Sequence, residues 1–185
     1  MRVLLERDIE DALHSRPDQF PVIDRVLRLN RWLARQYSVP SGIIDLLGLL
    51  DNDLVSEKSV AVVELKRGQI DARAIAQVCR YAGDIEDIQN HIANRYGAMT
   101  IWNKVVKVIV GNSVDRDTLL TAAALDIHLL KYEAAPSISL IGQWGFSDDV
   151  RSRRNRQHEQ LSEDSPFEDW VQEAKAIGAT WGKKW

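Results

Sequence analysis

The sequence predicts an α/β protein with a mixed central sheet flanked by helices, and three observations support this. Apolar residues recur at helical spacing near the N-terminus and in two later segments. Between these segments lie stretches rich in β-branched residues, which favour strands. The resulting order is helix, three strands, helix, strand, helix, strand, which is typical of a two- or three-layer α/β sandwich.

The first part of the chain is expected to supply a helix and a strand pair. An amphipathic helix is predicted over residues 4–15, because apolar side chains recur there every three or four positions. Residues 22–30 are ambiguous between helix and strand. The Pro-Ser-Gly turn at 40–42 then separates two stretches that we expect to pair antiparallel, residues 31–39 and 42–50.

The rest of the core alternates strands with helices. The expected elements are a strand at 59–68, a helix from 72 that continues with a break to Tyr96, a strand at 104–111, a helix at 115–126 and a strand at 127–133. Asp71 is suited to cap the first of these helices.

Two regions are expected along the chain, a core domain at 1–142 and an extension at 143–185. The extension begins as a polar linker and then carries strong helix signals over 164–178, with Ser165 as cap and Gly178 at the end. This helix is predicted to dock on the core or on a partner. The four tryptophans of the last fifth of the chain favour packing, with base stacking and subunit contact as alternatives.

Composition narrows the class of protein. The chain has 185 residues, 45% of them hydrophobic and 28% charged, and its net charge of −3 argues against coating nucleic acid through bulk charge. Its single cysteine, Cys79, excludes an intramolecular disulfide and a thiolate zinc framework. The charged N-terminal segment resembles neither a signal peptide nor a membrane span, so a cytoplasmic protein with no membrane partner is expected.

Three ionisable residues interrupt the apolar strands. In the strand at 59–68, Glu64 and Lys66 share a face with valines, because side chains alternate along a strand. Asp45 is the only polar member of its face in the stretch at 42–50. If the two strands are neighbours, Asp45 and Glu64 converge beside a lysine. An ion pair at a strand end is the simpler alternative for Glu64 and Lys66.

Two carboxylates so close together repel, so either one is protonated or a cation lies between them. Oxygen ligands select a hard ion such as Mg²⁺ or Mn²⁺, and these ions often bind together with phosphate.

The segments "GIIDLL", "VVELK" and "QVCRY" together resemble the PD-(D/E)xK nuclease superfamily in its RecB-like branch. With the flanks "VVELKRG" and "ERDIEDAL", the pattern looks most like the catalytic domain of the NucS-type endonucleases, over residues 4 to 135. The resemblance implies a restriction-endonuclease-like αβββαβ core with a C-terminal helical extension.

The resemblance also implies roles for individual residues. Asp45, Glu64 and the backbone carbonyl of Leu65 would bind the metal, and Lys66 would orient the attacking water and offset charge on the phosphate. Neighbouring carboxylates raise the pKa of a lysine, which favours Lys66 as electrostatic stabiliser over Lys66 as base. Other catalytic positions implied by the family pattern are Gln77, Tyr81 and, on the first helix, Glu10, with Glu6 as a weaker candidate.

The expected function is a Mg²⁺- or Mn²⁺-dependent DNA endonuclease that acts in repair, recombination or restriction, on branched, flap or mismatched DNA. RNA remains open as a substrate, and a homodimer as the assembly. Clustered arginines are more often a solvated face than a phosphate contact, and the candidates for phosphate contact are Arg35, Arg67, Arg73 and Arg80. The alternative function is a non-catalytic nucleic-acid-binding or assembly subunit with the same fold.

Overall fold

The computed structural model describes residues 4–55, 57–96, 102, 104–134 and 138–144. Its helices are α1 (Glu6–Ser15), the short 3₁₀ helix η1 (Pro17–Gln19), α2 (Ala72–Tyr96) and α3 (Arg116–Ala124). Its strands are β1 (Leu27–Val39), β2 (Gly42–Asn52), β3 (Lys58–Leu65), β4 (Gln69–Ile70), β5 (Val105–Gly111), β6 (Ser113–Val114), β7 (Ile127–Glu133) and β8 (Ser139–Trp144). None of the helices in these residues is both long enough and apolar enough to cross a membrane.

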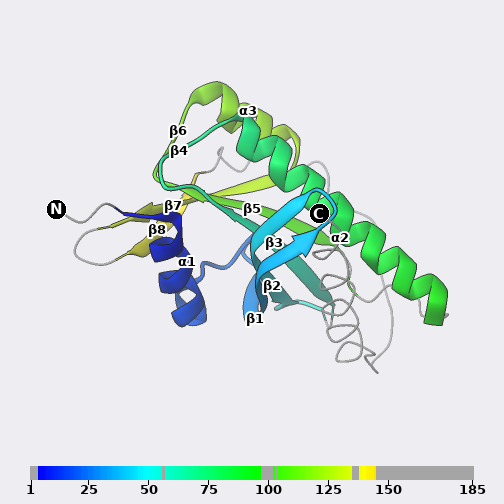
Figure 1. Ribbon diagram of the computed structural model, residues 1–185. Helices are drawn as coiled ribbons and strands as arrows, with labels where there is room; N and C mark the ends of the chain where they lie inside the picture. The colour runs from blue at the N-terminus through cyan, green and yellow to red at the C-terminus, as the bar shows by residue number, and fades with distance from the viewer. Residues whose placement is uncertain (1–3, 56, 97–101, 103, 135–137, 145–185) are drawn as a thin grey trace.

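The main sheet has six strands in the order β1-β2-β3-β5-β7-β8. The strands β1, β2 and β3 form an antiparallel meander, β5 and β7 then join parallel to β3, and β8 closes the other edge antiparallel to β7. The parallel strands are joined through α2 and α3, which lie on the same side of the sheet (Figure 1). The mixed α/β class predicted from the sequence is confirmed.

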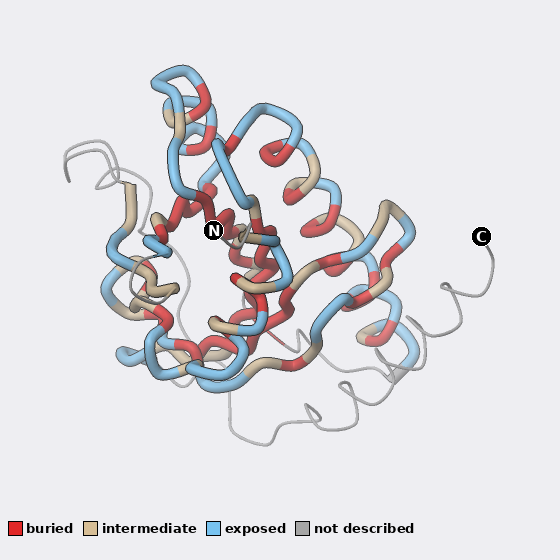
Figure 2. Tube along the Cα trace, turned by 60° about the vertical axis from the view of Figure 1, so that its left-hand side comes forward, coloured by how far each residue is buried: buried red, intermediate tan, exposed pale blue. Residues whose placement is uncertain are grey.

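Apolar side chains pack on both faces of the sheet, and Figure 2 shows the buried residues concentrated along the central strands. On one face, the α2-side cluster joins Val60 and Val62 of β3 to residues of α2 such as Val78. On the other face, the α1-side cluster joins Val63 to Ile9 of α1. Because β3 is covered from both sides, almost all its residues are buried, as in parallel sheets generally.

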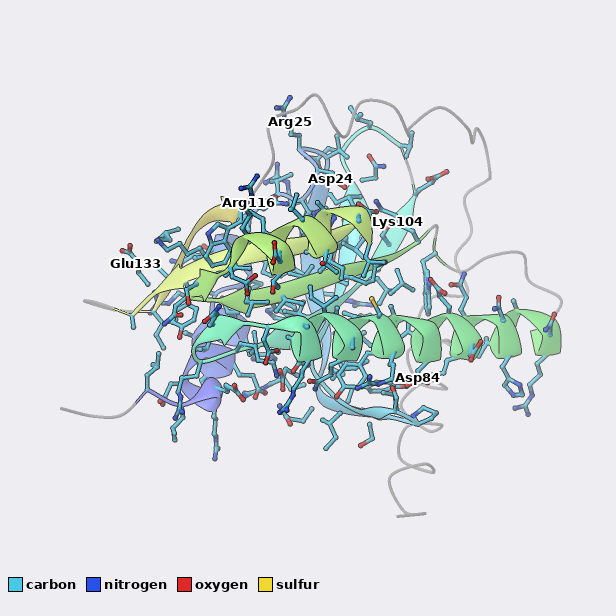
Figure 3. All side chains as sticks on the ribbon, turned by 90° about the horizontal axis from the view of Figure 1, so that it is seen from above. Asp24, Arg25, Asp84, Lys104, Arg116 and Glu133 are labelled. Carbon is cyan, nitrogen blue, oxygen red and sulfur yellow. The ribbon has the colours of Figure 1, made fainter. Side chains whose placement is uncertain are left out.

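The hairpin between β1 and β2 is anchored to α2. Ser41, in the turn, donates from its backbone nitrogen to the Asp84 carboxylate at 3.0 Å and also from its hydroxyl. Figure 3 shows Asp84 on α2 beside this hairpin. The hairpin tip is therefore fixed against the helix, next to the beginning of β2.

The structure differs from the sequence prediction in three places. The ambiguous segment at 22–30 contains the start of β1, and the break expected in the helix before Tyr96 is wrong, because α2 is one continuous helix. The strand predicted at 59–68 ends at Leu65, and the chain then pairs β4 with β6 in a separate two-stranded sheet. The strand β8 was not predicted. The helix predicted at 164–178 lies outside the described residues, as does most of the extension.

The packing around β2 predicts opposite effects for two glycine substitutions. A Cβ at Gly48 would lie 2.8 Å from Leu29 Cδ1 and 3.1 Å from a Trp32 ring carbon, whereas a Cβ at Gly83 in α2 meets nothing within 4 Å. We expect Gly48→Ala to destabilise the fold by about 1–3 kcal/mol through overpacking. Gly83→Ala should stabilise it by up to about 1 kcal/mol, because alanine is the better helix former. Urea denaturation of both variants measures the difference, and equal effects would contradict it.

Candidate active site

The structure brings Asp45 and Glu64 to neighbouring positions on β2 and β3. The antiparallel register pairs Leu46 with Val63, and one step further it places Asp45 opposite Glu64. Asp45 Oδ2 also accepts a hydrogen bond of 2.8 Å from the backbone nitrogen of Leu65. The two residues that the sequence predicts to converge therefore lie on neighbouring strands at the carboxyl end of β3, close enough for the charge of Asp45 to raise the pKa of Glu64.

The Glu64 side chain is the most deeply buried ionisable member of this site. The residue is 2% exposed, and its Oε2 is buried without a hydrogen-bond partner among the described residues. Its other oxygen, Oε1, lies 2.6 Å from the Lys66 ammonium. Burial raises the pKa of Glu64 to about 7, and the negative charge of Asp45 acts in the same direction. The hydrogen bond and positive charge of Lys66 lower the pKa, but by less. Burial likewise raises the pKa of Asp45, although hydrogen bonds from Leu65 and other donors oppose this.

Lys66 follows the last residue of β3 and begins a chain of polar contacts to α2. Its Nζ donates to Gln77 Oε1 at 3.5 Å, and Gln77 Nε2 donates to the Tyr81 hydroxyl at 2.8 Å. Burial disfavours the ammonium, but Glu64 and the other nearby carboxylates more than compensate and raise the pKa of Lys66. Lys66 therefore carries a proton at neutral pH, which suits a charge stabiliser better than a base.

Tyr81 is held by a close approach to the start of β2. At Gly42 the backbone has φ +149°, and a Cβ there would lie 2.7 Å from the Tyr81 hydroxyl oxygen. Only glycine allows both this conformation and the contact. The turn that precedes β2 therefore positions Tyr81 and, through it, Gln77.

The helix α1 contributes Glu10 from the other side of the hairpin. Its buried carboxylate accepts from Arg35 Nε at 2.7 Å and from Gln36 Nε2 at 2.9 Å, and Arg35 also pairs with Asp11 at 2.6 Å. Gln36 Nε2 lies 3.2 Å from Asp45 Oδ1 as well. Glu10 is thus linked to the paired carboxylates through one amide group.

The arginines predicted to contact phosphate occupy different environments. Arg35 is ion-paired with α1, as described above, whereas the Arg73 and Arg80 side chains are exposed on α2. Arg67 is also exposed, and its backbone nitrogen donates to Glu6 Oε1 at 3.2 Å. Glu6, the weaker candidate from the sequence, consequently lies close enough to affect the pKa of both Glu64 and Lys66.

The donor set fits a divalent cation that is bound partly by water. In the parts of the chain that the structure describes, no three His, Cys, Asp or Glu side chains are grouped to bind a metal. The unpartnered Oε2 of Glu64, beside the carboxylate of Asp45, nevertheless provides hard oxygen ligands in a place where an unpaired charge is costly. Two carboxylates, a backbone carbonyl and water form a ligand set typical of Mg²⁺.

Sequence reasoning missed the bridging residue Gln36 and the ion-pair role of Arg35. Both partners in the contact between Arg35 and Glu10 are 25 positions apart in the chain, so neither spacing nor periodicity indicates it. Gln36 has a positive φ of 48°, and no glycine, asparagine or aspartate next to it in the sequence indicates such a conformation.

These features define a mixed α/β protein whose sheet presents two carboxylates and a lysine at the ends of neighbouring strands. Residues 21–133 match the family described as Endonuclease NucS C-terminal domain, and the chain belongs to this family. The match includes β1 to β7 with Asp45, Glu64, Lys66, Gln77 and Tyr81, and begins after α1.

Two solved structures are similar to the chain at low identity. A repair endonuclease from Pyrococcus abyssi is 20% identical with a TM-score of 0.47, and the match covers 72% of this chain and 49% of that one. A complex of EndoMS with dsDNA is 21% identical with a TM-score of 0.44, covering 71% and 47%. The chain thus spans about half the length of these proteins. No curated protein matches it significantly.

The buried state of Glu64 predicts a specific dependence of stability on pH. Because its pKa is raised from 4.5 to about 7, the folded protein retains a proton that the unfolded chain releases, and stability falls as pH rises through this window. Glu64→Gln should abolish this loss, which amounts to at most about 3 kcal/mol.

Urea denaturation with a metal chelator present measures the loss for wild type and variant from pH 4.5 to above 7. Glu133→Gln is the matched control, because it removes an exposed carboxylate from the last residue of β7, two strands away from β3 (Figure 3). An identical pH profile for wild type and Glu64→Gln would contradict the burial argument.

Proposed function

We propose that the protein is a divalent-metal-dependent DNA endonuclease of the PD-(D/E)xK type. The observation that carries this proposal is the buried Oε2 of Glu64, which has no hydrogen-bond partner in the described part of the chain. The same side chain pairs with Lys66 through Oε1 and lies close enough to Asp45 for that charge to raise its pKa. A strand end gains no stability from such a group, since an unsatisfied buried carboxylate oxygen costs free energy. Membership in an endonuclease family supports the same function independently.

Asp45, Glu64 and the Leu65 carbonyl would hold Mg²⁺ or Mn²⁺, which when bound polarises a phosphoryl oxygen and lowers the pKa of water. Side chains of the protein stabilise the developing charge and are held in position by one another. The protonated Lys66 stabilises negative charge that develops on the phosphate, and Gln77 keeps its ammonium oriented toward the site. Tyr81 fixes the Gln77 amide from one helical turn away.

The proposed substrate is DNA that carries a flap, branch or mismatch, in a repair pathway. Membership in an endonuclease family supports a nucleic acid as the substrate class. The choice among these DNA structures depends on surfaces and further domains, because the metal site contacts only a phosphodiester group. RNA also contains phosphodiester groups, so it is included as a test substrate. Two cuts with a constant stagger would indicate that two copies of the protein act together.

Three nearly isosteric substitutions test the catalytic assignment. We expect Asp45→Asn, Glu64→Gln and Lys66→Met to reduce cleavage by at least about 10²-fold, because each removes a charge aligned with the reacting phosphate or its metal. Their far-ultraviolet circular dichroism should match the wild type. The assay incubates each protein with Mg²⁺ or Mn²⁺ and labelled single-stranded, duplex, flap, junction, mismatch and RNA substrates.

The control for this panel is again Glu133→Gln, which should cleave like the wild type. Undiminished cleavage by Glu64→Gln would refute the assignment. Nucleic-acid binding by the wild type without any cleavage, under either metal, would instead favour the non-catalytic binding subunit.

The exposed arginines of α2 are proposed to contact the DNA backbone. Arg73→Ala and Arg80→Ala should each weaken binding to all sequences equally and lower the slope of log K against log salt by about one. The measurement is fluorescence anisotropy in the Glu64→Gln background without metal. Arg25→Ala is the control, because Arg25 precedes β1 at the end of that strand remote from Asp45 (Figure 3). An unchanged slope for both α2 variants would place the DNA elsewhere.

A further inference from the structure

Gln36 occupies a strained position directly opposite Asp45. It has φ 48°, in the left-handed region that side chains other than glycine, asparagine and aspartate seldom adopt. The ladder pairs Arg35 with Leu46 and Tyr37 with Ile44, so Gln36 falls opposite Asp45 without interrupting the register of the hairpin. Strain of this kind persists only where the surroundings enforce it, and it is frequent at functional sites.

The regular alternation of side chains along β2 is also broken at this point. Ile44 belongs to the α2-side cluster, whereas Leu46, two residues later, belongs to the α1-side cluster. Residues two apart in a regular strand share a face, so the alternation is broken at Asp45. The irregular backbone of Gln36 on β1 therefore lies opposite the residue of β2, Asp45, at which the alternation is broken.

This geometry places the amide of Gln36 between the carboxylates of Glu10 and Asp45. Its Nε2 lies 2.9 Å from Glu10 Oε2 and 3.2 Å from Asp45 Oδ1. Ionised carboxylates only accept hydrogen bonds, and an amide nitrogen has two hydrogens, so one nitrogen can satisfy both acids. With Leu65 donating to Oδ2, both oxygens of Asp45 are then oriented.

The neutrality of this donor distinguishes it from its neighbours. Arg35 compensates the charge of Glu10, and Lys66 compensates that of Glu64. A cation in the place of Gln36 would also compensate Asp45 and would compete with a divalent ion for it. A neutral amide fixes the carboxylate and leaves its charge available.

We propose that Gln36 is a positioning residue that orients Asp45 for divalent-cation binding by bridging it to Glu10. This inference rests on the proposed function. It predicts that the side chain of Gln36 matters for metal affinity and that its strained backbone does not contribute to folding stability.

The test uses Gln36→Gly, which removes the amide and also suits the positive φ. The control is Asp126→Gly, at an exposed residue with φ 54° after α3, where glycine also suits the positive φ but no site residue is touched. Its gain in stability should be the smaller of the two, because aspartate tolerates this conformation better than glutamine. Gln36→Asn is the second variant, because asparagine tolerates this conformation but its shorter amide does not reach both acids.

Thermal unfolding with increasing Mn²⁺ gives both stability and metal affinity without a cleavage assay. We expect both glycine variants to melt at or above the wild-type temperature without metal. Gln36→Gly and Gln36→Asn should require about tenfold more Mn²⁺ for the half-maximal shift, as is typical for lost groups that orient metal ligands. Their cleavage rate should fall and recover partly at high Mn²⁺, whereas Asp126→Gly should match the wild type.

Wild-type Mn²⁺ affinity in Gln36→Gly would overturn this inference and leave the proposed function intact. A Gln36→Gly protein that melts early, together with normal Mn²⁺ affinity in Gln36→Asn, would assign the residue to folding and would overturn it as well. If the wild type shows neither a Mn²⁺-induced shift nor cleavage, the proposed function itself fails, and the inference fails with it.

Discussion

The burial of the Glu64 carboxylate is the constraint on which the rest of the site depends. An ionised carboxylate that is 2% exposed loses most of its hydration, and the loss must be offset by nearby groups. Lys66 supplies one contact to Oε1, at 2.6 Å, while Oε2 has no hydrogen-bond partner within the described ranges of the chain. The contacts from Lys66 to Gln77 and on to Tyr81 therefore fix the cation that offsets part of this loss.

The helix α1 is joined to the hairpin of β1 and β2 by a second set of paired charges. Its apolar residues Ile9 and Leu13 pack on the sheet, and this places Glu10 against β1. Arg35 then joins the helix to the strand by pairing with both Glu10 and Asp11. An arginine that looks like a phosphate ligand in the sequence thus has a structural partner, which is why a cluster of like charges does not by itself identify a nucleic-acid surface.

The sequence was informative where the chain is regular. Alternation along β3 placed Glu64 and Lys66 on one face, and apolar flanks marked Asp45 as an unusual charge, because buried strands tolerate few polar residues. Irregular positions gave no such signal. The conformation of Gln36 depends on its neighbours in space, and the two-residue strands β4 and β6 are too short to show a period.

The charges gathered at the site support the proposal that a divalent cation, and not a second basic residue, is bound there. When both are ionised, Asp45 and Glu64 contribute two negative charges and Lys66 one positive charge, while Glu10 is compensated by Arg35. Glu6 adds a further carboxylate nearby, since it lowers the acidity of Glu64 and of Lys66. The site therefore has an excess of negative charge before any substrate arrives. A phosphodiester would increase that excess, and only a cation of high charge density, bound by hard oxygen atoms, offsets both at once.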